Sequence, residues 1–410
     1  MNAFRQLRAV EPLKALYRSR PVSFFSHTQQ HPMAMRINNT PMNRSRFMFT
    51  SASGGGGSYI HLPTRGLLQI HGKDASKFLQ GLITNHMPRI ENGGGGFLAA
   101  FLSPKGRVMY DVLIYPVNDT KEGSDPAYLI ECDARALPEL HKHIARFVLR
   151  SKVKMVGVTE SFDVYSVLDD QPANNNEDEA APPTSAAVME RLAKMNATIG
   201  MWDNRAVNHM GYRAIVPKGQ SLLLPENYKQ GTLEEYHVRR IVNGVPEGID
   251  DFIAGTSLPL ECNLDYMNGV DFRKGCYVGQ ELTIRTYHKG ITRKRVMPVQ
   301  YFNPQEPEPE SIQFNKSASH VIPPQSELFP TKKATPTPQA ASTSSARPVR
   351  ASGKTGSNVG NIGLALVKLD TVKEGATFDV MDREGATVRV KAFFPSWWPK
   401  QPEAEEGGDE

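Results

Sequence analysis

Apolar residues recur with helical spacing in three segments of the chain. The first stripe occupies positions 75, 78, 79, 82 and 83 and follows Asp74, which is expected to be its N-cap. A second stripe covers residues 137–148. The third helix is expected to begin with the capping box formed by Thr232 and Glu235 and to stop at Gly244.

Alternating apolar and polar positions predict strands between and after these helices. The predicted strands are residues 59–62, 107–115, 127–132, 153–158, 162–168 and 212–216, and then 294–301, 359–367, 377–381 and 387–393. Their spacing is too irregular for a doubly wound parallel sheet. The expected fold class is therefore α+β, with a small β module at the C-terminal end.

Three stretches lack the apolar residues that a packed core requires. Residues 169–187 are acidic and rich in Asn and Pro, residues 303–358 are dense in Pro, Ser, Thr and Lys, and residues 401–410 form an acidic tail. Chains of this composition bury too little surface to offset the entropy lost on ordering. All three are predicted to be disordered segments at the surface.

The N-terminal residues 1–57 have the composition of a mitochondrial transit peptide. They carry eight Lys or Arg against one acidic residue, and no apolar stretch is long enough for a secretory signal. Without them the net charge changes from +5 to about −2, so nothing indicates a nucleic-acid partner. No run reaches the length of a membrane span, and a mitochondrial matrix protein is expected. The alternative is an exposed disordered arm.

Cysteine usage limits the chemistry. Three cysteines in 410 residues exclude a disulfide framework and fit a reducing compartment. Cys132, Cys262 and Cys276 show no C-x-x-C spacing, and a conventional iron-sulfur cluster needs four thiolates. Any cluster that touches this chain is expected to do so transiently or together with a partner.

One octapeptide, KGCYVGQE at residues 274–281, concentrates reactive groups between two glycines. Gly275 and Gly279 favour a bend that presents Cys276 and lets a ligand approach closely. The neighbouring Arg273 and Lys274 would favour the thiolate form, which attacks electrophiles and binds soft metals. The alternative is a small buried cysteine in a tight turn.

This octapeptide resembles the signature of folate-binding, aminomethyltransferase-like proteins that support iron-sulfur cluster maturation. The resemblance also covers Pro259, Glu261, Asn263, Leu264, Asp265, Gly269, Val270, Phe272, Arg285, Gly290 and Arg293. It implies a three-module ring with an aminomethyltransferase-like folate-binding region at residues 58–290 and a C-terminal β-barrel at residues 291–400. It also implies tetrahydrofolate or a related pterin at the centre of the ring.

Two segments are similar to the folate site of the aminomethyltransferases, with departures. Where the transferases usually carry two adjacent acids, this chain has Tyr110 and Asp111. Arg240 matches the arginine that binds folate in the transferases, while their nearby glutamate is replaced by Val242. A carboxylate such as Asp111 could exchange a proton with a bound folate, and a guanidinium suits its carboxylate tail.

These departures, together with the cysteine signature, favour a non-enzymatic assembly factor over a glycine-cleavage enzyme. The resemblance implies help in assembling [4Fe-4S] clusters on enzymes of the aconitase and lipoate-synthase types, with A-type scaffold proteins as partners. Cys276, Lys274 and Asp111 are the expected reactive residues, and Cys276 is the expected transient ligand of iron. The residues expected at a cofactor are Arg240, Asp111, Glu261, Asn263, Asp265, Tyr277, Gln280 and Glu281. Two alternatives stay open, namely a folate-dependent aminomethyltransferase and a pure interaction protein in which Cys276 is structural.

Overall fold

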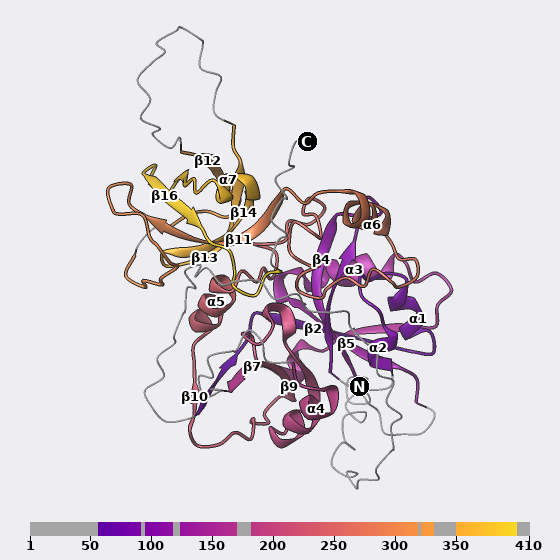
Figure 1. The fold of residues 1–410 in the computed structure, drawn as a ribbon. Helices are drawn as coiled ribbons and strands as arrows, with labels where there is room; N and C mark the ends of the chain where they lie inside the picture. Colours follow the sequence, from indigo (N-terminus) through magenta and orange to yellow (C-terminus); the bar gives the residue numbers. More distant parts are fainter. Residues whose placement is uncertain are drawn as a thin grey trace, which may run out of the picture. The chain divides into compact units, whose positions relative to one another are not determined.

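Two five-stranded sheets are formed by the strands that precede residue 231 (Figure 1). The computed structural model describes residues 56–91, 95–117, 124–169, 182–318, 321–331 and 350–399. The first sheet has the strand order β10-β1-β7-β9-β8, and the second has the order β3-β4-β5-β2-β6. Their strands are β1 (Gly57–His61), β2 (Arg65–His71), β3 (Phe97–Leu102), β4 (Val108–Pro116), β5 (Ala127–Asp133), β6 (Lys154–Gly157), β7 (Phe162–Asp169), β8 (Ile199–Trp202), β9 (Tyr212–Pro217) and β10 (Tyr228–Gln230).

Strand alternation places each sheet between two apolar cores. In β4, Leu113 and Tyr115 join a core that also contains residues of the first sheet, while Val112 and Ile114 face a second core on the opposite side. Strand pairing in both sheets is antiparallel except for β1 with β10. The predicted α+β class is thereby confirmed.

Helices cover the outer face of each sheet. Helices α1 (Ala75–Gln80), α2 (Pro88–Glu91) and α3 (Leu137–Ala145) contribute to the outer core of the second sheet, and α4 (Ser185–Lys194) contributes to that of the first. Helix α5 (Leu233–Val242) begins with the predicted capping box. Its Tyr236 and Ile241 are buried in the core that the two sheets share. Two further helices are α6 (Gln280–Lys289) and α7 (Leu369–Lys373).

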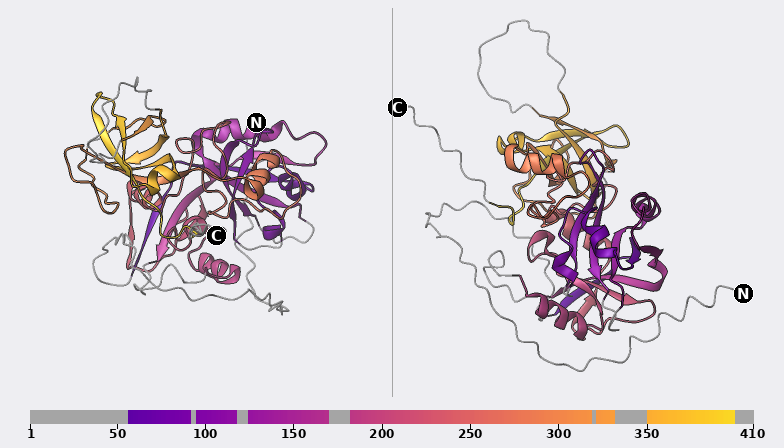
Figure 2. Two further views of the ribbon diagram at one scale, coloured as in Figure 1. Left: turned by 45° about the horizontal axis from the view of Figure 1, so that its top comes forward. Right: turned by 90° about the vertical axis from the view of Figure 1, so that its right-hand side faces the viewer.

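The strands after residue 293 close into a barrel, which Figure 2 shows in orange and yellow. Its order is β11-β14-β13-β12-β15-β16, and β16 pairs with β11 to complete the ring. The predicted union of residues 294–301 with later strands is therefore confirmed. The barrel strands are β11 (Lys294–Phe302), β12 (Glu327–Pro330), β13 (Gly353–Val359), β14 (Ile362–Lys368), β15 (Phe378–Met381) and β16 (Thr387–Ala392).

The prediction of a disordered insertion at residues 303–358 is wrong over much of its length. Strand β12 and most of β13 lie inside this range, and β12 pairs with both β13 and β15. The segment has few large apolar residues, but Ile312, Ile322 and Leu328 are 5%, 2% and 0% exposed. Sparse apolar residues therefore suffice where each one reaches the core. Residues 332–349 lie outside the described part.

Two other predictions need correction. The predicted disordered segment 169–187 is ordered at both ends, because Asp169 accepts hydrogen bonds from Arg191 of α4 and Thr184 caps that helix. Residues 170–181, the predicted leader up to residue 55 and the acidic tail lie outside the described residues.

Asp74 occupies the N-cap position of α1, but its carboxylate accepts from the backbone N–H of Lys152 and does not cap the helix.

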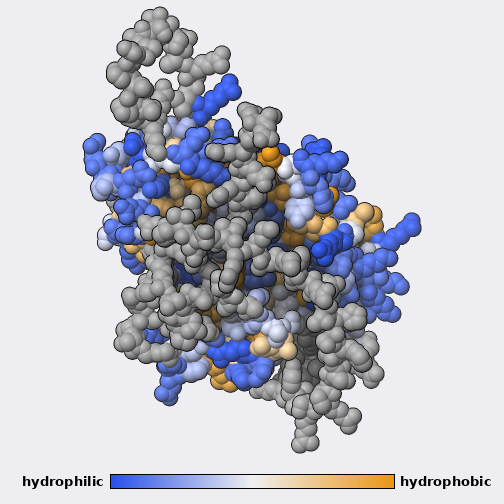
Figure 3. Space-filling view, in the orientation of Figure 1, coloured by the Kyte–Doolittle hydropathy of each residue, from blue (hydrophilic) through white to orange (hydrophobic). Residues whose placement is uncertain are grey.

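On the face that Figure 3 shows, hydrophobic residues of the described part lie in patches among hydrophilic ones. None of the helices in the described ranges has the length and apolar character needed to span a membrane.

Candidate functional site

Cys276 is the accessible thiol of the chain. All three cysteines lie in the described residues, and Cys276 is exposed whereas Cys132 and Cys262 are buried. Burial raises the pKa of the Cys132 thiol to about 12 and also raises the pKa of Cys262. Thiols that stay protonated are poor nucleophiles and poor metal ligands. Thiolate chemistry is therefore left to Cys276.

Lys274 anchors the segment that carries Cys276. Its ammonium donates to the backbone carbonyls of Gln80, Ile83 and Asn85 at 2.7, 2.7 and 2.8 Å. It also lies 4.8 Å from the centre of the Tyr277 ring, within the range of a cation–π contact. Burial lowers the pKa of Lys274 to about 8, and the nearby Asp271 carboxylate opposes that shift. The amine thus holds the loop to the chain between α1 and β3, and its predicted effect on the Cys276 thiol stays a prediction.

Backbone hydrogen bonds fix the segment on both sides of Cys276. Before it, the Asp271 N–H donates to the Thr84 carbonyl at 3.0 Å, and the Asp271 carboxylate accepts from the N–H groups of Arg273 and Lys274. After it, the Val278 N–H donates to the Gly81 carbonyl at 3.0 Å. The thiol is consequently presented from a fixed tip rather than from a free arm.

The two glycines of the octapeptide serve different purposes. Gly279 has a φ of 78°, and a Cβ at this position would lie 2.2 Å from the carbonyl oxygen of Ser103. Only glycine fits there without strain, and the residue forms the tight start of α6. A Cβ on Gly275 would meet nothing within 4 Å. A side chain at position 275 would therefore meet no neighbouring atom, and the close approach of a ligand to Cys276 stays a prediction.

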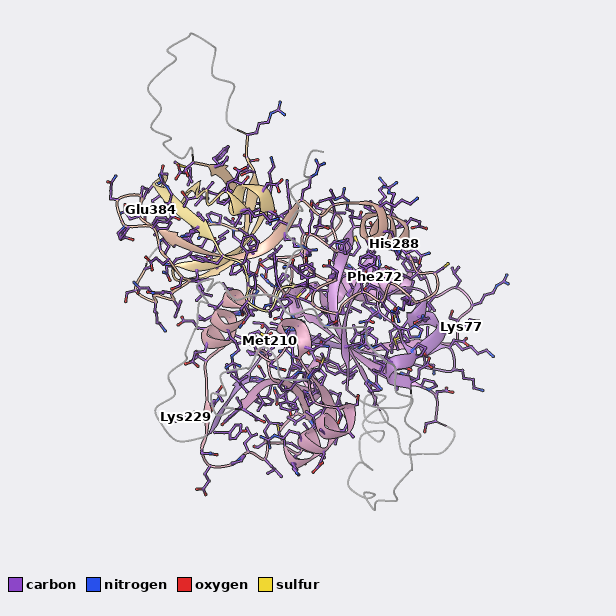
Figure 4. The ribbon with its side chains drawn as sticks, in the orientation of Figure 1. Lys77, Met210, Lys229, Phe272, His288 and Glu384 are labelled. Atoms are coloured by element: carbon purple, nitrogen blue, oxygen red, sulfur yellow. The ribbon has the colours of Figure 1, made fainter. Side chains whose placement is uncertain are left out.

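The residues that follow Cys276 turn the chain into α6. Tyr277 is 5% exposed and joins the core shared by the two sheets. Its N–H donates to the side-chain oxygen of Gln280 at 3.3 Å, so Gln280 supports the loop, while the cofactor contact predicted for it stays a prediction. Glu281 is exposed on the first turn of α6. Figure 4 labels Phe272, which precedes the octapeptide, and His288, which lies near the end of α6.

The segment before the loop is tied to the barrel. Asn263 donates its amide to the Val296 carbonyl at 2.7 Å, and Asp265 pairs with Arg295 at 2.8 Å. The Arg295 guanidinium also lies 3.7 Å from the centre of the Tyr266 ring. Asn263 and Asp265 therefore hold the segment to β11, which differs from the cofactor contact predicted for them. Their polar atoms are already used inside the protein.

Glu261 lies in different surroundings from these two residues. It lines a cavity of about 290 Å³ between α6 and the start of β11. Burial raises the pKa of its carboxyl group, an effect that the nearby Lys294 and Arg107 oppose. Among the residues predicted at a cofactor, Glu261 thus combines partial burial with contact to a cavity.

Known proteins resemble the chain over most of its length. Residues 293–400 match the family described as CAF17, C-terminal beta-barrel domain. A relative from Mycosarcoma maydis named "Iron-sulfur cluster assembly factor IBA57 homolog, mitochondrial" is 36% identical, over 82% of this chain and 84% of that protein. The human protein named "Iron-sulfur cluster assembly factor IBA57, mitochondrial" is 35% identical, over 87% of this chain and 91% of its own length.

The chain belongs to the IBA57 family. A relative from Neurospora crassa is 38% identical over 82% of this chain. Membership of the IBA57 family confirms the family resemblance and the mitochondrial location that the sequence predicts. It also agrees with the aminomethyltransferase-like fold, because the glycine cleavage system aminomethyltransferase T of Bartonella henselae matches 84% of this chain with a TM-score of 0.54. At 12% identity that likeness shows the fold alone.

Arg240 is fully engaged with other residues of the protein. Its guanidinium pairs with Asp251 at 2.7 Å and donates to the Ser357 hydroxyl of the barrel at 2.8 Å. Further hydrogen bonds reach the Val245 carbonyl and the His237 ring. This IBA57-family chain therefore uses Arg240 to join α5 to the barrel, whereas the sequence predicts a fork that holds folate.

Asp111 is buried, at 6% exposure, rather than on a solvent-facing strand surface. Both oxygens of its carboxylate accept from the Gly248 N–H, at 3.1 and 3.2 Å. Burial raises the pKa of Asp111 to about 6, and the nearby Arg65 limits that rise. The predicted role of Asp111 in proton exchange with a folate stays a prediction.

A network of buried charges beside Asp111 is absent from the sequence predictions. Its members are Arg65, Tyr115, Glu131, Asp203, Arg205, Arg213, Tyr236 and Glu247. Glu247 accepts from Arg205 at 2.7 Å and from the Tyr236 hydroxyl at 2.6 Å. The surrounding arginines hold the pKa of Glu247 well below its usual range. The network joins strands of both sheets to α5.

One signal in the sequence could have indicated this network. Glu131 directly follows the apolar residues Tyr128, Leu129 and Ile130 in β5 and is 0% exposed. A buried carboxylate requires a cationic partner. Its partners, Arg65 and Arg213, lie 66 residues before it and 82 residues after it, so spacing alone could not identify them.

Proposed function

We propose that this protein assists the assembly of [4Fe-4S] clusters in mitochondria by offering the Cys276 thiolate to a cluster held mainly by a partner. The observation that carries the proposal is an exposed thiol at the tip of a loop that is fixed by Lys274, Asp271 and Val278. A ligand that must meet a partner's cluster needs both access and a defined position. The names of the relatives support the same role.

Shared ligation follows from the number of accessible thiols. A cluster with four cysteine ligands needs four thiolates, and this chain presents one at its surface. The remaining ligands would come from the partner, which we propose to be an A-type scaffold protein. Enzymes of the aconitase and lipoate-synthase types are the proposed recipients. Cys276 then holds the cluster during transfer and is released afterwards.

A role for tetrahydrofolate receives little support from the residues predicted to bind it. Arg240 is paired with Asp251 and Ser357, and Asn263 and Asp265 are occupied by the barrel. Asp111 is buried, and both oxygens of its carboxylate accept from the Gly248 N–H. The present residues do not form an open fork for a folate carboxylate, and we propose no step through folate.

Glycine-cleavage chemistry is not favoured. Tyr110 takes the place of the first acid of the transferase pair, and Val242 takes the place of the transferase glutamate. The matching arginine, Arg240, is buried in an internal ion pair. The aminomethyltransferase likeness therefore concerns the fold, while the relatives' names concern cluster assembly.

The test is a rescue experiment in mitochondria that lack the native protein. Cys276→Ser should fail to restore aconitase activity although the variant accumulates to the normal level. The matched control is Cys132→Ser, in which the serine hydroxyl can replace the thiol that donates to the Asp133 carbonyl. This control should restore activity.

Full rescue by Cys276→Ser would remove its role as a ligand and leave an interaction protein with a structural cysteine. The protein level must be measured in parallel, because a variant that is degraded would lose activity for an unrelated reason. Thermal unfolding of purified Cys276→Ser, expected to match wild type because the residue is exposed, decides that point.

A further inference from the structure

Helix α6 begins four residues after Cys276, and a cavity opens along it. The cavity has a volume of about 290 Å³ and lies between α6, the segment before Asn263 and the start of β11. Its walls are mostly apolar, and the residues that line it include Leu258, Leu260, Leu282 and Ile291. A cavity of this kind accepts a large apolar side chain.

Apolar side chains are also exposed at the C-terminal end of α6. Ile291 at the rim of the cavity is 81% exposed, and Tyr287 is 51% exposed. Tyr287 stacks on Phe272 with ring centres 3.6 Å apart and an angle of 13° between the rings. The stack places a flat aromatic surface between the Cys276 loop and the end of the helix. Exposed aromatic and aliphatic groups beside a cavity are typical of protein interfaces.

The same segment carries a concentrated positive charge. Residues 271–294 contain six Lys or Arg and two acidic residues, a net charge of +4, while the chain after residue 57 has a net charge of about −2. Arg273, Arg285, Lys289 and Arg293 are exposed. Positive charge of this density attracts an acidic surface and steers it during association.

We propose that α6 and the cavity beside it form the docking surface for the acidic face of the protein that carries the cluster. The partner inserts an apolar side chain into the cavity, its acidic residues meet Arg285, Lys289 and Arg293, and its cluster is thereby brought to Cys276. The inference rests on the proposed function, because it takes the occupant to be the partner that shares the cluster. The positive charge and the nearby thiol favour an acidic, cluster-carrying protein over a second copy of the chain, because a symmetric contact between two copies would bring two basic surfaces together.

The test measures binding of a purified A-type scaffold protein, loaded with its cluster, to the full-length protein by calorimetry. Ile291→Glu places a charge at the mouth of the cavity, and Arg293→Glu reverses a charge on the same surface. Each variant should weaken binding by about tenfold or more. Both residues are exposed, so the variants should unfold at the wild-type temperature.

Matched controls come from the edge of the first sheet. Leu223 is 63% exposed and Lys229 in β10 is exposed, so Leu223→Glu and Lys229→Glu introduce the same negative charges on that sheet, and Figure 4 shows Lys229 far from His288 of α6. Both controls should bind as wild type does. Equal loss in the controls would mean that any added negative charge weakens binding, and this would overturn the proposed surface.

Cys276→Ala separates the docking surface from the proposed function. Weakened binding in Ile291→Glu and Arg293→Glu, with an unchanged cluster spectrum in Cys276→Ala, would support the surface and contradict ligation by Cys276. Wild-type affinity in both α6 variants would overturn the surface, whatever Cys276→Ala shows. Preferential binding to a second copy of the chain, detected by ultracentrifugation and lost in Ile291→Glu, would also overturn the proposed occupant.

Discussion

Replacing Lys274 with methionine should release the Cys276 loop from the body of the protein. Methionine has nearly the same length but cannot donate to the carbonyls of Gln80, Ile83 and Asn85, which Lys274 contacts at 2.7 to 2.8 Å. Lys274→Arg should also release the loop, because a planar guanidinium cannot direct its N–H groups to three carbonyls arranged around a single ammonium.

The expected loss of local stability is moderate, because the gain from the hydrogen bonds of Lys274 is opposed by the cost of desolvating its ammonium. A hydrogen bond to a charged group contributes roughly 1.5–3 kcal/mol, so the three bonds together contribute at most about 9 kcal/mol. Desolvation of the ammonium, visible in the pKa of Lys274 lowered to about 8, offsets part of that gain. We therefore expect a loss of about 2–4 kcal/mol in local stability.

Amide hydrogen exchange measures this loss directly. The N–H groups of Asp271 and Val278 are bonded to Thr84 and Gly81 on either side of the tip, so their exchange reports opening of the loop. A loss of about 3 kcal/mol corresponds to roughly 100-fold faster exchange. Lys289→Met, which removes an exposed lysine from α6, is the control and should leave these amides unchanged. Unchanged exchange in Lys274→Met would refute the anchoring role.

Three further predictions concern the loop, the buried acid and the barrel. Gly279→Ala should lower the free energy of unfolding by about 1–3 kcal/mol in denaturant titration, because of its positive φ and the close Ser103 carbonyl, whereas Gly275→Ala should be neutral. Burial raises the pKa of Asp111 to about 6, so the folded state binds this proton more tightly than the unfolded state, and stability falls as pH rises from about 4 to 6. Asp111→Asn should remove this pH dependence, which is worth about 3 kcal/mol, when the free energy of unfolding is measured across that range. Deleting residues 303–354 should lower the free energy of unfolding by several kcal/mol or prevent folding, since it removes β12 together with the buried Ile322 and Leu328. Thermal unfolding followed by circular dichroism tests this, and a transition at the wild-type temperature would contradict it.

Local patterns in the sequence predict much of the fold. Alternation at residues 107–115 and 212–216 corresponds to β4 and β9, and the capping box of Thr232 and Glu235 begins α5 as expected. These features depend on neighbours within a few residues, which a sequence displays directly. Strand β12 was missed because its four residues gain their stability from pairing with β13 and β15, which are distant in the chain.

The candidate site shows the same difference between features set by neighbouring residues and features set by distant ones. The octapeptide at residues 274–281 identifies the Cys276 loop because its glycines and its thiol are adjacent in sequence. The occupation of Arg240 by Asp251 and Ser357 depends on partners 11 and 117 residues away, which no local pattern reveals. A motif can therefore indicate where a guanidinium stands without indicating whether it is free to bind a ligand.

The most direct test of the account is the alkylation rate of Cys276, followed by mass spectrometry, in the presence of an A-type scaffold protein with and without its cluster. Cys132 and Cys262 are buried and serve as internal controls that should react slowly throughout. The account predicts that Cys276 reacts readily in the free protein and is protected by the cluster-loaded scaffold much more than by the cluster-free scaffold. Equal reactivity of Cys276 in both mixtures would contradict its role as a ligand of the shared cluster.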